Sequence, residues 1–162
     1  MTTPVSSEVV SGIVTGDFNA DGKQDLTLLT AGQLDGNGNI IPNTSGALVL
    51  PGNGNFTFGK SSLLAAGIYP LTGAYGDFNR DGKPDLAIAQ FASTQDPITN
   101  FGLIVLPGLG NGTFGSASNY LVPQFNGSGN SIVFAGDFNH DGAADIMVGG
   151  AGSSAVFMNR AH

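Results

Sequence analysis

Three copies of the tetrapeptide Gly-Asp-Phe-Asn, beginning at Gly16, Gly76 and Gly136, recur in this chain at a fixed spacing of 60 residues. Self-similarity at such a period is typical of repeat proteins, in which each copy forms one supersecondary unit. Each copy continues with an Asp-Gly pair, a further aspartate and a short apolar run, such as residues 86–89. The chain is therefore predicted to consist of three copies of one structural unit.

The apolar segments of each copy are short and are bounded by Gly, Asn and Asp, which favours buried β-strands over helices. In the first copy, strands are expected at 12–15, 26–29 and 47–51, and a fourth is expected after the Phe-Thr-Phe-Gly segment at 56–59. Glycine makes up 26 of the 162 residues, which indicates many tight turns. Four short strands per copy form one blade of a β-propeller, so we predict an all-β fold built of propeller blades.

The ends of the chain do not coincide with the ends of the repeats. We expect one β-propeller domain over residues 1–162, with repeats at approximately 10–69, 70–129 and 130–162. The third repeat ends near its third strand, whereas residues 1–9 align with the fourth strand of a repeat. Propellers have roughly 4–8 blades, so three blades cannot close a ring. We therefore predict a homodimer in which two half-propellers form a six-bladed ring, with the N-terminal segment as the closing outer strand of the partner's last blade.

Nine residues from Asp17 to Asp25 place carboxylate or amide oxygens at positions 1, 3, 5 and 9 and a glycine at position 6. Ca²⁺ prefers six to eight oxygen ligands, and alternate side chains of a curled loop can converge on one ion, with position 7 contributing its backbone carbonyl. We predict one Ca²⁺ in each repeat, three per chain. The candidate ligands are Asp17, Asn19, Asp21, Lys23 and Asp25; Asp77, Asn79, Asp81, Lys83 and Asp85; and Asp137, Asn139, Asp141, Ala143 and Asp145.

An Asp-Gly pair is also a common hairpin signal, so the alternative is that these loops are ordinary turns. The distribution of acids favours calcium, because nine of the 12 acidic residues occupy positions 1, 5 and 9 of the loops. Carboxylates about 4 Å apart repel by roughly 1 kcal/mol per pair in water and about 4 kcal/mol at an effective dielectric of 20, which a plain turn does not offset. The loop differs from an EF-hand, since position 12 is apolar, and the ninth-position Asp is predicted to take the bidentate role.

The charge balance excludes some partners. Asp and Glu total 12 against five Lys and Arg, giving a net charge of −7, so a phosphate backbone is repelled and we expect no nucleic-acid partner. Six positive charges from three Ca²⁺ would bring the net charge from −7 to −1. Residues 1–10 contain no basic region and no apolar run, so neither a signal peptide nor membrane insertion is predicted there.

These features resemble the FG-GAP (VCBS) repeat family, whose blades build the integrin α-subunit propeller and many secreted bacterial and fungal proteins. The matching residues are the three D-x-N-x-D-G-x-x-D loops, the Leu-Pro-Gly-x-Gly segments at Leu50 and Leu106, and Thr-Phe-Gly at Thr57 and Thr113. The resemblance implies calcium in the loop between the first and second strands of each blade, and a secreted, extracellular or cell-surface protein. Fungal lectins of similar repeats bind sugars between blades. Three repeats instead of the usual seven depart from the family's closed monomer.

The remaining residues do not favour an enzyme. With nine acids assigned to calcium, Glu8, Asp35 and Asp96 form no evident pair for glycoside hydrolysis, and no G-x-S-x-G motif or cysteine occurs. We expect a calcium-stabilised binding or scaffold module without catalytic activity, for which the candidate ligands are a carbohydrate and an extracellular protein. The alternatives are a carbohydrate-binding lectin with sites between blades and an accessory domain of a larger enzyme.

Two groups of residues are candidates for ligand contact. The long polar connections at 33–45 and 90–100 carry side chains suited to sugar hydroxyls, although tolerated surface insertions would look the same. The aromatic residues that could floor a sugar site, with core or rim packing as the alternative, are Tyr69, Tyr75, Tyr120 and Phe125.

Overall fold

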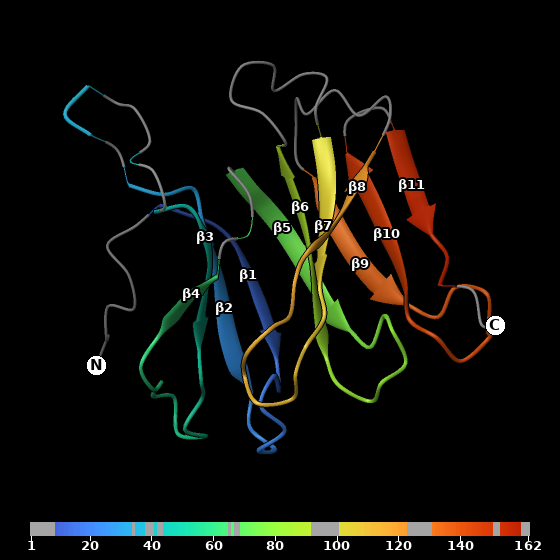
Figure 1. Cartoon of the computed structure of the whole chain (residues 1–162), viewed down its shortest axis with the longest axis horizontal. Helices are drawn as coiled ribbons and strands as arrows, with labels where there is room; N and C mark the ends of the chain where they lie inside the picture. Colours follow the sequence, from blue (N-terminus) through green and yellow to red (C-terminus); the bar gives the residue numbers. More distant parts are fainter. Residues whose placement is uncertain are drawn as a thin grey trace.

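The computed structural model of the chain describes residues 9–33, 35–37, 41, 44–64, 66, 69–91, 101–122, 131–150 and 153–159. Eleven strands and no helix occur in these residues, so none of them belongs to a helix that could cross a membrane. The strands form three antiparallel sheets that stand side by side along the longest axis (Figure 1).

Each sheet is a meander whose strands pair in sequence order. The first contains β1 (Val10–Gly16), β2 (Asp25–Thr30), β3 (Gly46–Leu50) and β4 (Ser62–Leu64). The second contains β5 (Tyr69–Gly76), β6 (Asp85–Phe91), β7 (Phe101–Leu106) and β8 (Ser118–Leu121). The third contains β9 (Ile132–Gly136), β10 (Asp145–Gly150) and β11 (Ser153–Phe157).

This architecture confirms the all-β prediction and the four-stranded, blade-like sheets of the first two repeats. Within the described residues, the third sheet has three strands, as expected from where the sequence pattern stops. The predicted closing strand, residues 1–9, falls outside the described part of the chain except for Val9. Ring closure and dimer formation stay predictions.

The middle sheet is covered on both faces, which explains why its second strand is an uninterrupted apolar run. In β6, residues 86–89 are all fully buried. Since successive side chains of a strand point to opposite faces, Leu86 and Ile88 pack in a core shared with the first sheet. Ala87 and Ala89 pack in a second core shared with the third sheet. Periodic alternation of polar residues is absent because neither face of this strand meets water.

The sheets approach each other most closely at their first strands, β1 against β5 and β5 against β9. A Cβ atom at Gly12 in β1 would lie 2.6 Å from the carbonyl oxygen of Leu71 in β5, so a side chain there would collide with the neighbouring backbone. Close first strands are the arrangement expected around a propeller axis.

Candidate metal-binding loops

The three nine-residue loops join the first and second strands of each sheet and share one backbone conformation. The residue at position 4 has a positive φ without being glycine: 59° at Ala20, 63° at Arg80 and 61° at His140. The glycine at position 6 follows with φ values of 80°, 80° and 83°. Because left-handed residues turn the chain sharply, two of them in three positions curl each loop on itself.

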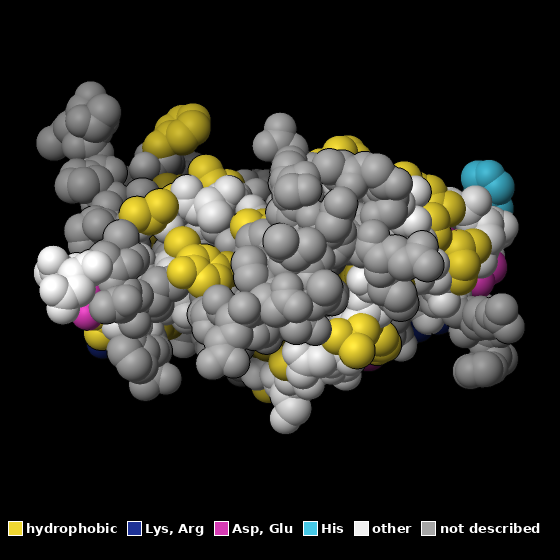
Figure 2. All heavy atoms as spheres, turned by 90° about the horizontal axis from the view of Figure 1, so that it is seen from above, with side chains coloured by type: hydrophobic (Ala, Val, Ile, Leu, Met, Phe, Trp, Pro, Cys, Tyr) yellow, Lys and Arg dark blue, Asp and Glu magenta, His cyan; other side chains and the backbone are white. Residues whose placement is uncertain are grey.

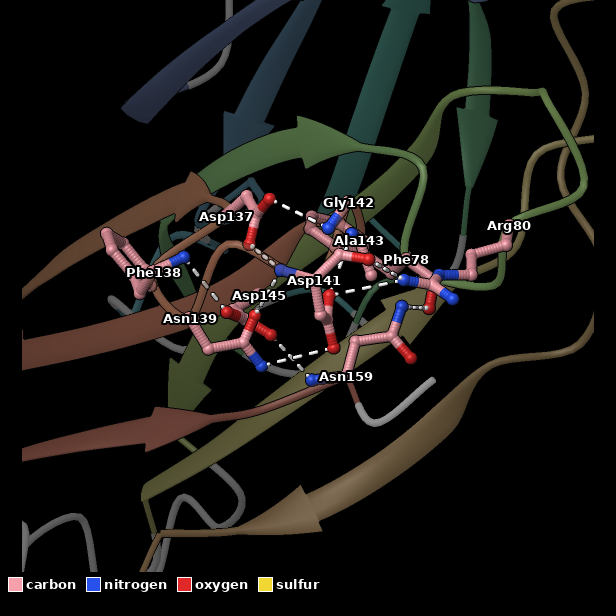
Figure 3. A network of polar contacts seen from close by, with 10 residues as sticks. All are labelled: Phe78, Arg80, Asp137, Phe138, Asn139, Asp141, Gly142, Ala143, Asp145 and Asn159. Atoms are coloured by element: carbon pink, nitrogen blue, oxygen red, sulfur yellow. Dashed lines mark hydrogen bonds and ion pairs between the residues drawn. The ribbon is translucent and has the colours of Figure 1, made fainter. Parts of the chain in front are cut away.

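The curl allows the side-chain oxygens of positions 1, 3 and 5 to accept hydrogen bonds from backbone N–H groups of the same loop. In the first loop, Asp17 Oδ1 and Asn19 Oδ1 both accept a hydrogen bond from the backbone N–H of Asp21, at 3.1 and 3.0 Å. Asp17 Oδ2 accepts from Gly22 N–H at 2.8 Å, and Asp21 Oδ1 accepts from Lys23 N–H at 2.9 Å. The same bonds recur in the second loop and in the third, which Figure 3 shows.

The fifth-position carboxylates lie at the surface beside cationic side chains. Lys23 Nζ is 3.3 Å from Asp21 Oδ2, and the second loop has the same pair. In the third loop, where Ala143 replaces the lysine, Arg80 reaches across from the second loop to Asp141 at 3.2 Å (Figure 3). The backbone N–H of Lys23 lowers the pKa of Asp21, with smaller contributions from the side chains of Lys23 and Asn19. The Asp21 carboxylate is therefore held as an anion.

The ninth-position aspartates have a second role that the sequence did not reveal. Asp25, Asp85 and Asp145 are buried, and each accepts two backbone hydrogen bonds. One comes from position 2 of the same loop, as from Phe78 N–H to Asp85 Oδ2 at 2.9 Å. The other comes from the turn after the third strand, as from Gly108 N–H to Asp85 Oδ1 at 2.8 Å. In the other two repeats, the corresponding backbone N–H donors are Phe18 and Gly52 for Asp25, and Phe138 and Asn159 for Asp145.

This pairing fastens the first loop of a blade to the turn after its third strand, so the two lie at the same end of the sheet. The Leu-Pro-Gly segment is the sequence signal that could have predicted it. A Cβ atom at Gly108 would lie 1.9 Å from the carbonyl oxygen of Pro84, so only glycine allows this approach. Burial raises the pKa of Asp85, and the hydrogen bonds from Gly108 and Phe78 oppose that shift.

The donor set of each loop suits a hard cation. Within the described residues, no group of three or more Asp, Glu or His side chains is arranged to hold a metal ion as it stands. In each loop, however, the carboxylate of position 1 and the amide oxygen of position 3 accept a hydrogen bond from the same backbone N–H, and the carboxylate of position 5 accepts one from the N–H two residues later. The ninth carboxylate reaches the same loop through the N–H of position 2. Oxygen-only donors of this kind match Ca²⁺ and not the softer metals.

A cavity of about 810 Å³ lies between the second and third sheets. Its lining includes the aromatic residues Phe78, Tyr120 and Phe157 and the polar residues Asn79 and Asn159. The rings of Tyr120 and Phe157 are 5.8 Å apart, so one wall of the cavity is aromatic. Among the predicted aromatic candidates, Tyr120 therefore lies where a ligand between blades could reach it.

The repeat explains why the cavity forms at this junction. Between the first and second sheets, Phe114 packs edge-on against Phe18 with ring centroids 5.5 Å apart, and Tyr75 packs on the same ring at 6.0 Å. Phe114 belongs to the turn before the fourth strand, and the described part of the third sheet has no equivalent turn. Phe78 corresponds to Phe18. Where the ring of Phe18 packs against Phe114, the ring of Phe78 instead borders the cavity.

The structure describes few of the other residues predicted to contact a ligand. Much of 33–45 and nearly all of 90–100 lie outside the described residues, as do Phe125, Glu8 and Asp96. Asp35 caps a local turn, accepting a hydrogen bond from the N–H of Asn37 at 2.9 Å.

The sequence model of a family described as FG-GAP-like repeat matches residues 17–88 and 98–148. The two matched segments contain all three nine-residue loops. No curated protein sequence matches the chain.

Proposed function

Because the chain belongs to the FG-GAP-like repeat family, we propose that it is a calcium-stabilised β-propeller module that binds or scaffolds another molecule and has no catalytic activity. The observation that supports this most directly is the threefold repetition of a curled loop lined by carboxylate and amide oxygens. We place the chain in an exported protein, since extracellular calcium-binding modules hold the ion with dissociation constants of about 10⁻⁴–10⁻³ M.

Electrostatics is the physical reason to expect a cation. Each loop holds three aspartates within nine residues, and the ninth is buried with only backbone N–H donors bonded to it. Surface lysines or an arginine compensate the fifth-position carboxylate alone. A bound Ca²⁺ supplies two positive charges to the loop. Asp17, Asn19, Asp21 and Asp25, with the Lys23 carbonyl, are the proposed ligands in the first loop, and their equivalents serve the other two.

Thermal unfolding with and without calcium tests this proposal. At a free calcium concentration one hundred times the dissociation constant, each site stabilises the folded state by about 2.7 kcal/mol, and three sites by about 8 kcal/mol. For a chain of this size, that corresponds to a melting temperature roughly 15 to 30 °C higher in calcium than in EDTA. Titration calorimetry should give three ions per chain.

The matched control is a chain carrying Asp21→Asn, Asp81→Asn and Asp141→Asn together. These substitutions keep an oxygen at each position and remove three charges that lie at or near the surface, so the protein should fold but lose most of its calcium response. An identical melting temperature of the unsubstituted chain in calcium and EDTA would show that the loops are ordinary turns.

A carbohydrate ligand is the second candidate, and the cavity between the second and third sheets favours it. Aromatic faces and amide side chains together, here Tyr120, Phe157, Asn79 and Asn159, are the groups that contact sugar rings and hydroxyls. A protein ligand needs no such cavity, so the two candidates differ in whether small glycans bind directly.

A glycan array in millimolar calcium tests the lectin candidate. Tyr120→Ala should abolish selective binding, whereas Leu121→Ala, which changes an exposed neighbour on the same strand, should leave it intact. A blank array from folded protein would reject the lectin and direct the search to protein ligands. Equal binding by both variants would place the sugar elsewhere.

A further inference from the structure

The third sheet carries an apolar face whose equivalents in the other repeats are covered by the next sheet. Phe134 and Phe138 stand 120 residues after Val14 and Phe18, at the same positions of the repeat. Val14 and Phe18 are 5% and 1% exposed, because the second sheet packs on them. Phe134 and Phe138 are 55% and 47% exposed.

The third strand of that sheet shows the same contrast. Val156 pairs with Met147, just as Val49 pairs with Thr27 at the equivalent place in the first sheet. Val49 is 1% exposed and Val156 is 48% exposed. We call the surface formed by Ile132, Phe134, Phe138 and Val156 the terminal face.

The first sheet exposes the opposite half of such a junction. Ile13 is 61% exposed, whereas its equivalent Val133 is 6% exposed and lies in the core between the second and third sheets. The equivalent in the second sheet, Gly73, is also at a junction: a Cβ atom there would lie 3.0 Å from Val14 Cγ2. Phe56 and Phe58 in the β3–β4 turn are exposed as well. We call Ile13, Phe56 and Phe58 the leading face, and Figure 2 shows hydrophobic side chains at the surface at both ends of the row of sheets.

The backbone of Phe56 has the conformation that its equivalent in the second repeat uses to contact a neighbouring loop, although Phe56 itself is exposed. Phe56 is fully exposed and has a φ of 63°, a left-handed conformation that is unfavourable for a residue with a side chain. Its equivalent in the second repeat, Gly112, has a φ of 78° and donates its N–H to Phe18 O of the neighbouring loop at 2.9 Å. A Cβ atom at Gly112 would lie 3.5 Å from Asn19 Cβ, an ordinary contact, so a side chain at this position fits over the neighbouring loop.

We propose that the leading face of one copy docks on the terminal face of a second copy, head to tail. The two faces are the two halves of the junction that already joins the first sheet to the second and the second to the third, which identifies the occupant as another sheet of this repeat. By that equivalence, Phe56 N–H donates to Phe138 O of the other copy, Phe58 packs on the Phe138 ring, and Ile13 meets Phe134. Two such junctions related by a twofold axis join two copies into one ring of six sheets. This inference does not depend on the proposed ligand.

The side chains at the new junction are larger than those at the internal ones, where Val14 lies beside Gly73 and Ala74 packs against the core that contains Val133. This difference supplies a matched pair of substitutions. Position 134 is equivalent to Ala74 of the second repeat, 60 residues earlier. Phe134→Ala therefore gives the terminal face the side chain found at an internal junction, and docking should persist. Phe134→Asp places an unpaired carboxylate in an apolar junction, where it should abolish docking.

Light scattering and sedimentation velocity at micromolar concentration, in calcium, test the proposal. The unsubstituted chain and Phe134→Ala should have twice the 16.4 kDa mass of one chain. Phe134→Asp and Ile13→Asp should each raise the dissociation constant at least about 1,000-fold, because the change is present in both junctions of the pair. Circular dichroism and a cooperative melt show that each variant is folded.

Mixing the two aspartate variants separates head-to-tail docking from other arrangements. A mixed pair has one junction with neither substitution, so a dimer should reappear in the mixture at concentrations where each variant alone is monomeric. A dimer that survives Ile13→Asp but not Phe134→Asp would mean that two terminal faces meet each other, which overturns the proposal. A monomeric unsubstituted chain, or an assembly larger than two copies, would overturn it as well.

Discussion

Replacement of Asp85 by alanine separates the structural role of a ninth-position carboxylate from its proposed role in calcium binding. Asp85 is 1% exposed, and its two oxygens accept the N–H groups of Phe78 and Gly108 at 2.9 and 2.8 Å. Alanine leaves both donors without a partner at the junction between the loop and the turn after β7. In EDTA, where no calcium contributes, the variant should therefore still be destabilised.

The magnitude follows from the two bonds. A buried donor left unsatisfied costs about 1–3 kcal/mol, so the loss of both partners costs roughly 2–6 kcal/mol. At about 2–4 °C per kcal/mol for a chain of this size, the melting temperature in EDTA should fall by roughly 4–24 °C. Asp81→Ala is the control, because Asp81 lies at the surface and its N–H partner, Lys83, can bond to water instead. That change should cost less than about 1 kcal/mol.

Circular dichroism melts of both variants in EDTA, followed by urea unfolding at 25 °C, measure the difference. In calcium, both variants should also lose the stabilisation from the ion bound in the second repeat. The difference between the melting temperatures of the two variants in EDTA therefore tests the role of Asp85. Equal stability of Asp85→Ala and Asp81→Ala in EDTA would refute the reasoning that the ninth carboxylate fastens the blade without metal.

Three further substitutions test the packing. Gly108→Ala should lower the free energy of unfolding, measured in urea, by about 1–3 kcal/mol, because the new Cβ would lie 1.9 Å from the carbonyl oxygen of Pro84. Gly149 has open space around it, so Gly149→Ala should change this free energy by less than about 0.5 kcal/mol. Equal effects of the two substitutions would contradict the close approach at Gly108. Phe56→Gly should raise the free energy of unfolding of the dissociated chain by up to about 1 kcal/mol, since glycine adopts a φ of 63° without strain. A lower free energy of unfolding in this variant would contradict the reasoning. Arg80→Ala removes a surface ion pair between the second and third loops, so the free energy of unfolding should fall by less than about 1 kcal/mol. Because salt screens surface charges, the effect should disappear in 1 M NaCl. A decrease above about 2 kcal/mol would contradict the surface position of the pair.

Much of the fold could be predicted because the signals are local and repeated three times. The apolar run at 86–89 between Gly-rich and Asp-rich turns predicted a buried strand, and β6 is buried on both faces. The spacing of Asp77, Asn79 and Asp81 predicted a curled loop, and in the structure Asp77 and Asn79 both accept a hydrogen bond from the backbone N–H of Asp81. Whether calcium fills that loop, and whether two chains close a ring, stay predictions.

Other properties depend on partners that are distant in the sequence. The sequence assigned Asp85 to metal alone, since nothing near it in the chain indicates a donor 23 residues away at Gly108. The cavity beside Phe78 was also missed as a specific place, because it forms where the described part of the third sheet has no counterpart to Phe114.

The three repeats, the strand order within each and the oxygen-rich loops follow from local sequence patterns, because turn chemistry and side-chain periodicity act over a few residues. Tertiary structure alone decided which chemically similar positions are buried and which are exposed. Phe18 and Phe138 occupy the same place in the same motif, yet one is enclosed by the second sheet and the other reaches solvent. The difference lies in the neighbour, since burial is a property of the surface that packs against a residue and not of the residue's own segment.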